Sequence, residues 1–476
     1  MALTPPPDQD IVVIGATGDL AARKLLPALY NLSAERLLPR RGRVIGVAPF
    51  AWDDERFRRH ARDAVKKFSR TGFDERAWSA FSKRLTFVPI DSSGDLSGIR
   101  AATKFKTRLV YLAVPSSAFG PLVTGLGAAG LAEGTSVIIE KPFGHDSATA
   151  HALNQTLHAV FPEPQIFRID HYLGKETVQN LLVFRFGNSI FERIWNRDAI
   201  EAVEITVAES LGVEGRGNMY EETGAIRDIV QNHLFQVLAV ACMEPPVSFD
   251  AEAIRNEKVK VLRAVHPVEP DDVVRGQYSA GRVGRKRVPG YRDEPGVSAR
   301  STVETYVAMR LCIDTWRWSG VPFHIRTGKR LAERETRITV RFRDVPLHLF
   351  AKTGVDHLDH NKLVIRIQPD EGIALRFVAK RPGAEIEIQT VRMDFSYGDS
   401  FKVSPPEAYE RLLHDALDGD HTLFIREDEV ERGWQIVQPV LDNPARIAMY
   451  EAGGWGPAEA DAVVSPYGWE SMEDMG

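Results

Sequence analysis

Short apolar runs alternate with helical patterns along the first third of the chain, and no other feature constrains the fold as strongly. The apolar runs occupy residues 11–14, 44–47, 86–90, 109–114 and 137–139, and helical patterns such as residues 22–34 and 54–68 lie between them. Continuous apolar character is typical of strands in a parallel sheet that is covered on both faces. The alternation therefore predicts an α/β domain with a doubly wound, Rossmann-like sheet, which we assign to residues 1–178.

From about residue 180 the pattern changes to longer helices and to strands in which apolar and polar residues alternate. The clearest strand candidates are residues 202–208, 337–343, 362–367 and 384–390. Such alternation is typical of an antiparallel sheet with one solvated or helix-covered face. We therefore predict an α+β domain with a large, mainly antiparallel sheet over residues 179–476. Residues 271–297 are rich in glycine, proline and charge, and we expect an ordered excursion over the surface there.

Composition and charge exclude several classes of protein. Apolar residues make up 43% of the 476 residues, which is ample for a sizeable core, and a net charge of −5 provides no basic footprint for nucleic acid. Two cysteines are too few for a disulfide framework or a thiolate metal site, and we expect no metal. A reducing cytoplasm is the simplest compartment for such a chain.

We expect no targeting segment and no membrane span. The first eight residues have neither a cationic region nor an apolar stretch of signal length. Residues 109–132 carry no charge and are long enough to cross a bilayer, but Pro115 and Gly120 interrupt them. A buried strand, a loop and a packed helix explain this stretch better.

A glycine turn follows the first predicted strand. Residues 15–21 read Gly-Ala-Thr-Gly-Asp-Leu-Ala and open the first helical pattern. A turn of this kind lets a pyrophosphate approach the backbone and lie at the helix N-terminus. The alternative, a tight strand-to-helix connection without a ligand, is about as probable from the spacing of the two glycines alone, and the position after the first strand favours the nucleotide site.

Residues 168–176 combine side chains that suit a phosphorylated, hydroxyl-rich ligand. They read Arg-Ile-Asp-His-Tyr-Leu-Gly-Lys-Glu, and so place Asp170, His171, Tyr172 and Lys175 beside a glycine. Lys175 supplies a point charge, and the imidazole and the phenol donate hydrogen bonds. A polar helix start at the surface is the usual meaning of such a cluster. The apolar run at residues 181–184 argues against it, because the segment then abuts a core.

Three further residues are candidates for a site. Lys141 in Glu-Lys-Pro follows the apolar run 137–139 and would project beyond the carboxyl end of a strand, although a surface lysine is the alternative. His233 lies on the inward stripe of a helical pattern, so it is either a catalytic base or a core histidine. Glu209 ends the alternation of residues 202–208 on the inward face, unless the strand simply ends there.

In this order, the motifs resemble the glucose-6-phosphate dehydrogenase family over nearly the whole chain. Residues 168–176 match the substrate signature of that family, and residues 15–21 resemble its coenzyme loop. Residues 321–331, which read Val-Pro-Phe-His-Ile-Arg-Thr-Gly-Lys-Arg-Leu, resemble the segment that carries a substrate lysine. The Glu-Lys-Pro motif is shared with oxidoreductases of the glucose–fructose oxidoreductase type, so it supports sugar dehydrogenation without naming the sugar.

The resemblance implies oxidation of D-glucose 6-phosphate at C1 to 6-phospho-D-glucono-1,5-lactone, the first step of the oxidative pentose phosphate pathway. It implies hydride transfer to NADP or NAD, and a homodimer or homotetramer formed through the second domain, which also binds the substrate. In the family pattern Asp-x-x-x-Asn-His, His233 is the general base, and Asp170 orients it. The substrate residues implied are Lys141, His171, Tyr172, Lys175, Glu209, Asp228, Lys329 and Arg334. The coenzyme residues implied are Gly15, Ala16, Thr17, Gly18, Asp19, Leu20, Lys24, Pro115 and Lys141.

One position departs from the family pattern and leaves the choice of coenzyme open. Related NADP enzymes carry an arginine after the second strand, and Pro49 stands there in this chain. No acidic residue stands there for an NAD ribose either, because Asp53 and Asp54 are expected to cap the next helix. Thr17 and Lys24 are candidate contacts to the extra phosphate, and Arg56 and Arg58 of the next helix are further candidates, each a looser substitute for that arginine.

Two other functions remain as alternatives. A dehydrogenase of the wider sugar oxidoreductase class would act on an unphosphorylated sugar, which the cluster of His171, Tyr172 and Lys175 disfavours. A non-catalytic sugar-phosphate sensor is disfavoured because both Asp170 and His233 are present.

Overall fold

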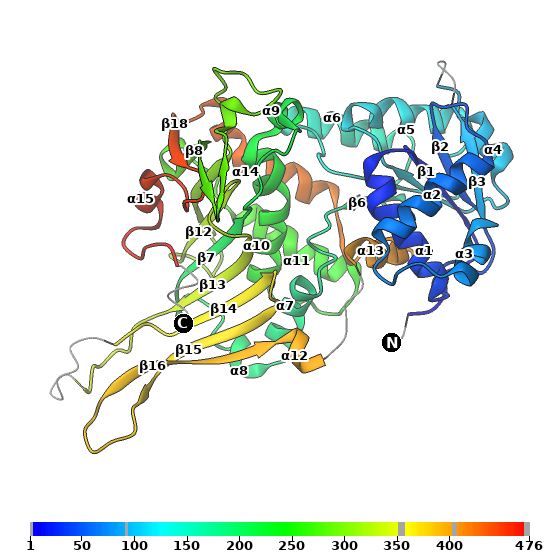
Figure 1. Cartoon of the computed structure of the whole chain (residues 1–476). Helices are drawn as coiled ribbons and strands as arrows, with labels where there is room; N and C mark the ends of the chain where they lie inside the picture. The colour runs from blue at the N-terminus through cyan, green and yellow to red at the C-terminus, as the bar shows by residue number, and fades with distance from the viewer. Residues whose placement is uncertain (1–2, 91–93, 351–357, 402–406, 471–476) are drawn as a thin grey trace. The chain divides into compact units, whose positions relative to one another are not determined.

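The computed structural model describes residues 3–90, 94–350, 358–401 and 407–470 (Figure 1). The chain forms two compact units. The first consists of Met1–Lys175, Pro246–Asn256 and Pro405–Glu431, and the second of Glu176–Pro245, Glu257–Ser404 and Arg432–Gly476. The predicted boundary after residue 178 lies close to the first crossing, and two later segments return to the first unit. No helix within the described ranges is long and apolar enough to cross a membrane.

The first unit is built on a seven-stranded sheet in the order β17-β6-β5-β4-β1-β2-β3. Its strands are β1 (Asp10–Ile14), β2 (Val44–Ala48), β3 (Leu85–Pro89), β4 (Arg108–Leu112), β5 (Thr135–Ile139), β6 (Ile166–Ile169) and β17 (Phe424–Ile425). All neighbours pair in parallel except the short β17. Every residue of β1, β2 and β4 is buried, which accounts for the continuous apolar runs. The predicted doubly wound, Rossmann-like fold is confirmed.

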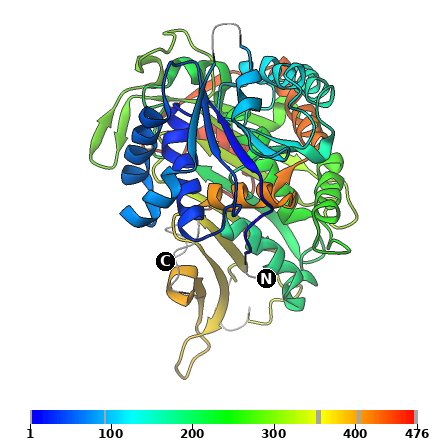
Figure 2. The same ribbon diagram turned by 90° about the vertical axis from the view of Figure 1, so that its right-hand side faces the viewer.

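Helices cover both faces of this sheet. They are η1 (Ala21–Leu25, a π-helical turn), α1 (Leu26–Ala34), α2 (Asp54–Phe68), α3 (Glu75–Ser82), α4 (Ser97–Ala102), α5 (Phe119–Ala128), α6 (Ser147–His158) and α13 (Ala408–Asp418). Strands β2 and β3 lie on one side of β1, and β4 to β6 lie on the other. Right-handed crossovers therefore place α1 and α2 on one face and α5 and α6 on the opposite face (Figure 2). The direction reverses between β1 and β4, where open sheets of this kind bind ligands.

The start of α2 shows how local sequence positions an element. The Asp53 carboxylate accepts the backbone N–H of Arg56 at 2.7 Å and caps the helix. The Asp54 carboxylate instead accepts the backbone N–H of Phe87 at 2.8 Å, and so ties α2 to β3. Of the two aspartates predicted as a cap, Asp53 alone has that role.

The second unit is built on a nine-stranded sheet in the order β16-β15-β14-β13-β7-β12-β11-β8-β18. Its strands are β7 (Ile200–Ala208), β8 (Val273–Ser279), β11 (Tyr306–Cys312), β12 (Pro322–Gly328), β13 (Glu335–Phe342), β14 (Lys362–Gln368), β15 (Gly372–Lys380), β16 (Ile388–Ser396) and β18 (Ile447–Glu451). Most neighbours are antiparallel, but β7 pairs in parallel with β12, and β8 with β18. Figure 1 shows β15 and β16 as a long hairpin at the edge of the sheet. The predicted large, mainly antiparallel sheet is confirmed.

Two details of the predicted second unit were wrong. Residues 384–387 belong to the connection between β15 and β16, and the strand begins only at Ile388. Residues 271–297 are not simply a surface excursion, because β8 pairs with β11 and β18 inside the large sheet. The remainder of that stretch includes the separate hairpin of β9 (Gly281–Val283) and β10 (Lys286–Val288), and a short 3-10 helix at Tyr291–Asp293.

The helices of the second unit include one π-helical segment that is important for the site. The helices are α7 (Glu176–Phe186), α8 (Ser189–Glu192), α9 (Gly217–Ala225), η4 (Ile226–Leu234), α10 (Phe235–Cys242), α12 (Tyr397–Phe401) and α15 (Asp461–Val464). Helices α11 (Ala251–Ala264) and α14 (Glu427–Asp442) begin in the first unit and continue in the second. The π-helical segment is η4, which packs against β12. Such segments are rare and occur frequently at functional sites.

Candidate active site

The glycine turn after β1 lies between the ends of β2 and β4, the strands on either side of β1. The backbone N–H groups of Gly15 and Ala16 donate to the Val47 carbonyl at the end of β2, at 2.8 and 3.2 Å. Gly15 has a φ of +89°, and a Cβ atom there would lie 2.2 Å from the Ala113 carbonyl oxygen beyond β4. Only glycine fits this position, because any side chain would collide with backbone. The turn therefore lies at the switch point of the sheet.

The other predicted coenzyme residues surround this turn. Asp19 and Lys24 lie on the helix that it opens, and both form ion pairs at the surface. Asp19 pairs with Arg23 at 2.6 Å, and Lys24 pairs with Glu407 at 2.6 Å. Thr17 and Leu20 are half-buried and Gly18 is exposed. Pro115 is exposed and follows β4 at the same edge of the sheet.

The segment after β2 carries an aromatic platform in place of the family arginine. Phe50 stacks on Trp52 with ring centroids 5.9 Å apart, and the Arg56 guanidinium lies 4.8 Å from the centroid of the Trp52 ring. Arg58 is engaged elsewhere, because it donates to the carbonyls of Ser82 and Leu85. The two candidate arginines thus differ: Arg56 lies on Trp52 after the end of β2, and Arg58 connects α2 to the neighbouring segment.

Two tyrosines that we did not predict hold the carboxylate beside Lys141. Glu140 follows β5 and is buried, and the Tyr111 hydroxyl donates to it at 2.5 Å. The Tyr409 hydroxyl, from α13, is a second donor to the same carboxylate. Burial raises the pKa of Glu140 above its ordinary value, although both hydroxyls and Lys141 oppose the shift. The Glu-Lys-Pro motif was a signal for Glu140, but nothing in the sequence indicated Tyr409.

The turn that follows β6 gathers the predicted phosphate-binding side chains. Asp170 is buried, and its carboxylate accepts the backbone N–H of Tyr172 at 2.9 Å. The Lys175 ammonium lies 3.8 Å from the centroid of the Tyr172 ring. The His171 ring lies parallel to that of Tyr409, with an interplanar angle of 11° and centroids 6.4 Å apart. One turn therefore presents an imidazole, a phenol and an ammonium together.

In the second unit, η4 carries Asp228 and His233. His233 is 1% exposed, and its backbone N–H donates to the Asn232 side chain at 2.6 Å. The start of η4 is positioned by Glu304, whose carboxylate accepts the backbone N–H of Ile226 at 3.2 Å. The helix is π-helical at this point, so a regular α-helical spacing does not describe how these residues share a face.

A cation lies between two carboxylates next to the same helix. Strands β7 and β12 pair in parallel with Ala208 opposite Gly328, so Glu209 and Lys329 leave the sheet side by side. The Lys329 ammonium donates to Glu209 at 2.5 Å and lies 3.8 Å from the Asp228 carboxylate. Lys329 is only 8% exposed. Arg334 is exposed, and forms no ion pair with any residue that the structure describes.

Comparison with known proteins identifies the family. The profile of the "Glucose-6-phosphate dehydrogenase, NAD binding domain" matches residues 12–180, and that of the "Glucose-6-phosphate dehydrogenase, C-terminal domain" matches residues 182–470. The chain belongs to the glucose-6-phosphate dehydrogenase family. The resemblance inferred from the motifs is therefore confirmed, and with it an oxidoreductase that carries a nicotinamide-binding domain.

Relatives and solved structures agree with this family. Glucose-6-phosphate 1-dehydrogenase from Aggregatibacter actinomycetemcomitans is 45% identical over 479 residues, covering 96% of both chains. Glucose-6-phosphate 1-dehydrogenase 2 from Mycobacterium tuberculosis is 44% identical, covering 94% of this chain and 91% of its own. A glucose-6-phosphate dehydrogenase solved in complex with its substrate glucose-6-phosphate superposes with a TM-score of 0.89, at 38% identity, covering 99% of this chain and all of the other. The enzyme from Mycobacterium avium superposes with a TM-score of 0.86 at 40% identity, covering 98% of this chain and 99% of the other.

Proposed function

We propose that the protein oxidises D-glucose 6-phosphate at C1 to 6-phospho-D-glucono-1,5-lactone, as the first step of the oxidative pentose phosphate pathway. The observation that carries this proposal is the turn after β6, which presents His171, Tyr172 and Lys175 together. An ammonium and two hydrogen-bond donors suit a phosphate, and a sugar without a phosphate cannot form these charge-assisted hydrogen bonds. This feature favours the phosphorylated substrate over the free sugar.

We propose His233 as the general base. An imidazole titrates near neutral pH, so it can take the proton from the C1 hydroxyl as the C1 hydrogen leaves with its electron pair. Asp170 is the proposed orienting carboxylate, as the family pattern implies. Glu209, Asp228 and Lys329 form a charged cluster in the second unit, and such a cluster suits sugar hydroxyls, which both donate and accept hydrogen bonds.

The first unit has the features that a dinucleotide requires. Gly15 leaves no room for a side chain, so a pyrophosphate can approach the backbone of the turn closely. The residues that would hold the coenzyme are those of the turn with Lys24, Pro115 and Lys141. The bound nicotinamide supplies the hydride acceptor. No metal is proposed, because proton removal by an imidazole and hydride transfer complete the reaction.

We infer that both NADP and NAD serve as coenzymes. Recognition of the 2′-phosphate of NADP is best provided by a bidentate arginine, and Pro49 offers neither charge nor donor. Arg56 is the substitute, because its guanidinium lies on Trp52 beside the end of β2. A single exposed cation is a weaker determinant than an arginine at position 49. We therefore propose a preference for NADP that is smaller than the family pattern implies, or is reversed.

We also propose a homodimer or homotetramer formed through the second unit. In support, β16 is an edge strand of the large sheet, and an edge strand presents unpaired backbone groups to another chain. Light scattering on the purified protein measures the assembly directly. Both cysteines are free thiols, which fits the reducing cytoplasm that we propose as its compartment.

Initial rates test the proposed function. We expect reduction of either coenzyme to depend on glucose 6-phosphate and to be far slower with glucose. Comparable efficiency on both sugars would support the wider sugar oxidoreductase class. Tight binding of glucose 6-phosphate without reduction of either coenzyme would support the non-catalytic sensor.

A further inference from the structure

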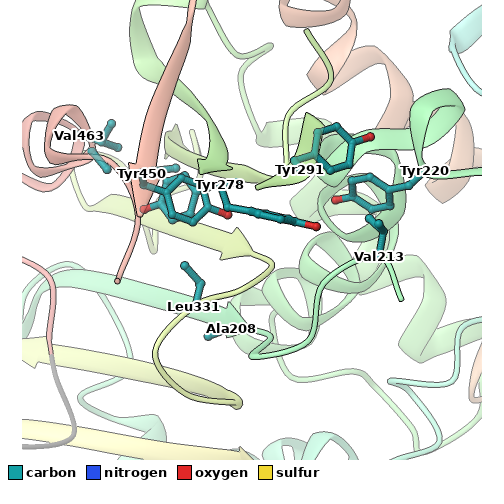
Figure 3. Close-up of a cluster of buried hydrophobic side chains, with 11 residues drawn as sticks. Ala208, Val213, Tyr220, Tyr278, Tyr291, Leu331, Tyr450 and Val463 are labelled. Atoms are coloured by element: carbon teal, nitrogen blue, oxygen red, sulfur yellow. The ribbon is translucent and has the colours of Figure 1, made fainter. Parts of the chain in front are cut away.

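Five buried tyrosines form a cluster beside the end of β12. They are Tyr220, Tyr278, Tyr291, Tyr306 and Tyr450, and none is more than 5% exposed. Figure 3 shows Tyr450, Tyr278, Tyr291 and Tyr220 in succession across this cluster. The Tyr278 and Tyr291 hydroxyls donate to Glu294 and Glu221, at 3.1 and 2.6 Å. A buried hydroxyl without a partner costs free energy, and these two hydroxyls are satisfied by carboxylates.

Two members of the cluster contact Lys329. The Lys329 ammonium lies 5.0 Å from the centroid of the Tyr220 ring. The Tyr450 hydroxyl donates to the Lys329 carbonyl oxygen at 2.6 Å. One tyrosine therefore contacts the charge of the lysine, and the other fixes its main chain.

The backbone on the C-terminal side of Lys329 is also constrained. Arg330 has a φ of +53°, which is strained for a residue with a side chain. Its N–H donates to Leu211 at 3.0 Å, and its carbonyl accepts from Gly453 at 2.7 Å. Its guanidinium lies 3.3 Å from Glu294, the carboxylate that Tyr278 also contacts. Tyr450 and the backbone hydrogen bonds of Arg330 therefore hold the main chain at Lys329 in one place.

The orientation of the Tyr220 ring is itself fixed by a neighbour. It meets the Tyr291 ring edge to face, at 75° with centroids 6.0 Å apart. Burial, with the nearby carboxylates of Asp228, Glu304 and Glu209, raises the pKa of Tyr220 well above its ordinary value. The phenol therefore stays neutral, and its ring face remains available to a cation.

We propose that Tyr220 is a positioning residue that holds the Lys329 ammonium between Glu209 and Asp228. A lysine side chain has four rotatable bonds, and two carboxylates on their own leave its ammonium free to move between them. A ring face on a third side removes that freedom, and a buried cation gains most from such a contact. The consequence for sugar recognition rests on the proposed function, in which Lys329 contacts the substrate.

Two substitutions separate the effect of the Tyr220 ring from the effects of its hydroxyl and of its side-chain volume. Tyr220→Phe keeps the ring, whereas Tyr220→Met keeps most of the volume without it. We expect Tyr220→Met to raise the KM for glucose 6-phosphate about ten-fold while kcat and the coenzyme KM change little, because ground state and transition state lose the same contact. Tyr220→Phe should have the same KM for glucose 6-phosphate as the parent. Tyr278→Leu is the matched control, since it disturbs the same cluster without contacting Lys329.

A second measurement does not depend on turnover. Acetic anhydride labels accessible amines, and mass spectrometry gives the labelling rate of Lys329 in the folded protein. We expect faster labelling in Tyr220→Met than in the parent and in Tyr220→Phe. Equal labelling in all three proteins, or an equal rise in Tyr278→Leu, would overturn the positioning role whatever the substrate is. Faster labelling in a protein that does not oxidise glucose 6-phosphate would support the positioning role and contradict only the proposed function.

Discussion

The two units hold their proposed recognition cations in very different ways. Arg56 of the first unit is exposed and lies on one aromatic ring. Lys329 of the second unit is 8% exposed, and it contacts two carboxylates and a ring, with its main chain fixed by Tyr450. A group held by many buried contacts resists substitution, whereas a group held by one exposed contact is readily replaced. Coenzyme choice should therefore be adjustable in this enzyme, and sugar recognition should not.

The difference arises although both units use the same geometric device. The coenzyme turn lies at the ends of the parallel strands β1, β2 and β4. Glu209 and Lys329 leave the ends of β7 and β12, a parallel pair within a mainly antiparallel sheet. Parallel neighbours bring the residues that follow them to one edge, and both proposed sites lie at such an edge. What differs is the packing around the two cations. Arg56 is an exposed residue of α2 that lies on one aromatic ring, whereas Lys329 is buried beside a tyrosine cluster.

The largest effect should come from the proposed base, which the second unit buries completely. We expect His233→Ala to lower kcat by roughly a hundred- to ten-thousand-fold while binding of glucose 6-phosphate changes little, because the base acts mainly in the transition state. Asp170→Asn should also lower kcat. Steady-state rates and calorimetric binding measure the two quantities, and near-parent turnover in His233→Ala would exclude it as the base.

The next effect concerns stability at acid pH, and it tests whether the second unit keeps a buried histidine neutral. Burial, followed by Arg310 and Arg341, lowers the pKa of His324 from 6.5 to about 4. Below pH 6.5 this histidine is protonated in the unfolded chain but stays neutral in the folded chain. The free energy of unfolding therefore falls as the pH drops from 6.5 to about 4. At about 1.4 kcal/mol for each pKa unit, the loss approaches ~3 kcal/mol.

Urea unfolding at several pH values measures this loss. His324→Gln should flatten the fall in the urea midpoint over that range, because glutamine has no proton to gain. His266→Gln, at an exposed histidine, should keep the slope of the parent. An unchanged slope in His324→Gln would show that other groups set the acid stability of the sheet.

A smaller effect is expected at the phosphate end of the substrate. Lys175→Ala should lower kcat/KM for glucose 6-phosphate by roughly ten- to a hundred-fold and leave kcat/KM for glucose unchanged, since a charge-assisted bond contributes about 1.5–3 kcal/mol. The ratio of kcat/KM for glucose 6-phosphate to kcat/KM for glucose should therefore fall. Lys66→Ala removes another lysine of the first unit that lies over an aromatic ring, and should leave both values unchanged. Equal losses on both sugars would place Lys175 away from the phosphate.

Much of this organisation could be predicted from the sequence where the signal is local. Both faces of β1, β2 and β4 are buried, so their residues are apolar without interruption, and the parallel sheet follows. The turn at Gly15 and the cluster around Lys175 could also be predicted, because each is formed by residues close together in the sequence. The strands β8 and β18 gave no such signal, because their pairing joins segments far apart in the chain.

Contacts between distant segments account for what was missed at the site. Tyr409 reaches Glu140 only because α13 returns to the first unit late in the chain. Glu209 meets Lys329 because of the register between β7 and β12, which neither segment specifies by itself. The tyrosine cluster draws on five separate segments, and a single tyrosine in a sequence does not indicate whether its ring faces a cation.

The smallest effect should be at the coenzyme, where the contrast between the two units can be tested directly. Pro49→Arg should shift the ratio of kcat/KM toward NADP by roughly 1–3 kcal/mol, because an arginine at the end of β2 can pair bidentately with the 2′-phosphate. Arg56→Ala should shift it toward NAD by less, about 0.2–1 kcal/mol, since an exposed ion pair with the 2′-phosphate contributes only that much. Arg59→Ala, an exposed arginine of the same helix, is the control and should leave the ratio unchanged. If Arg56 binds the 2′-phosphate, Arg56→Ala should change the ratio of kcat/KM less in the Pro49→Arg background than in the parent. Strict dependence on NADP that survives Arg56→Ala would instead mean that another cation recognises the phosphate. Coenzyme choice would then be as firmly determined as sugar recognition.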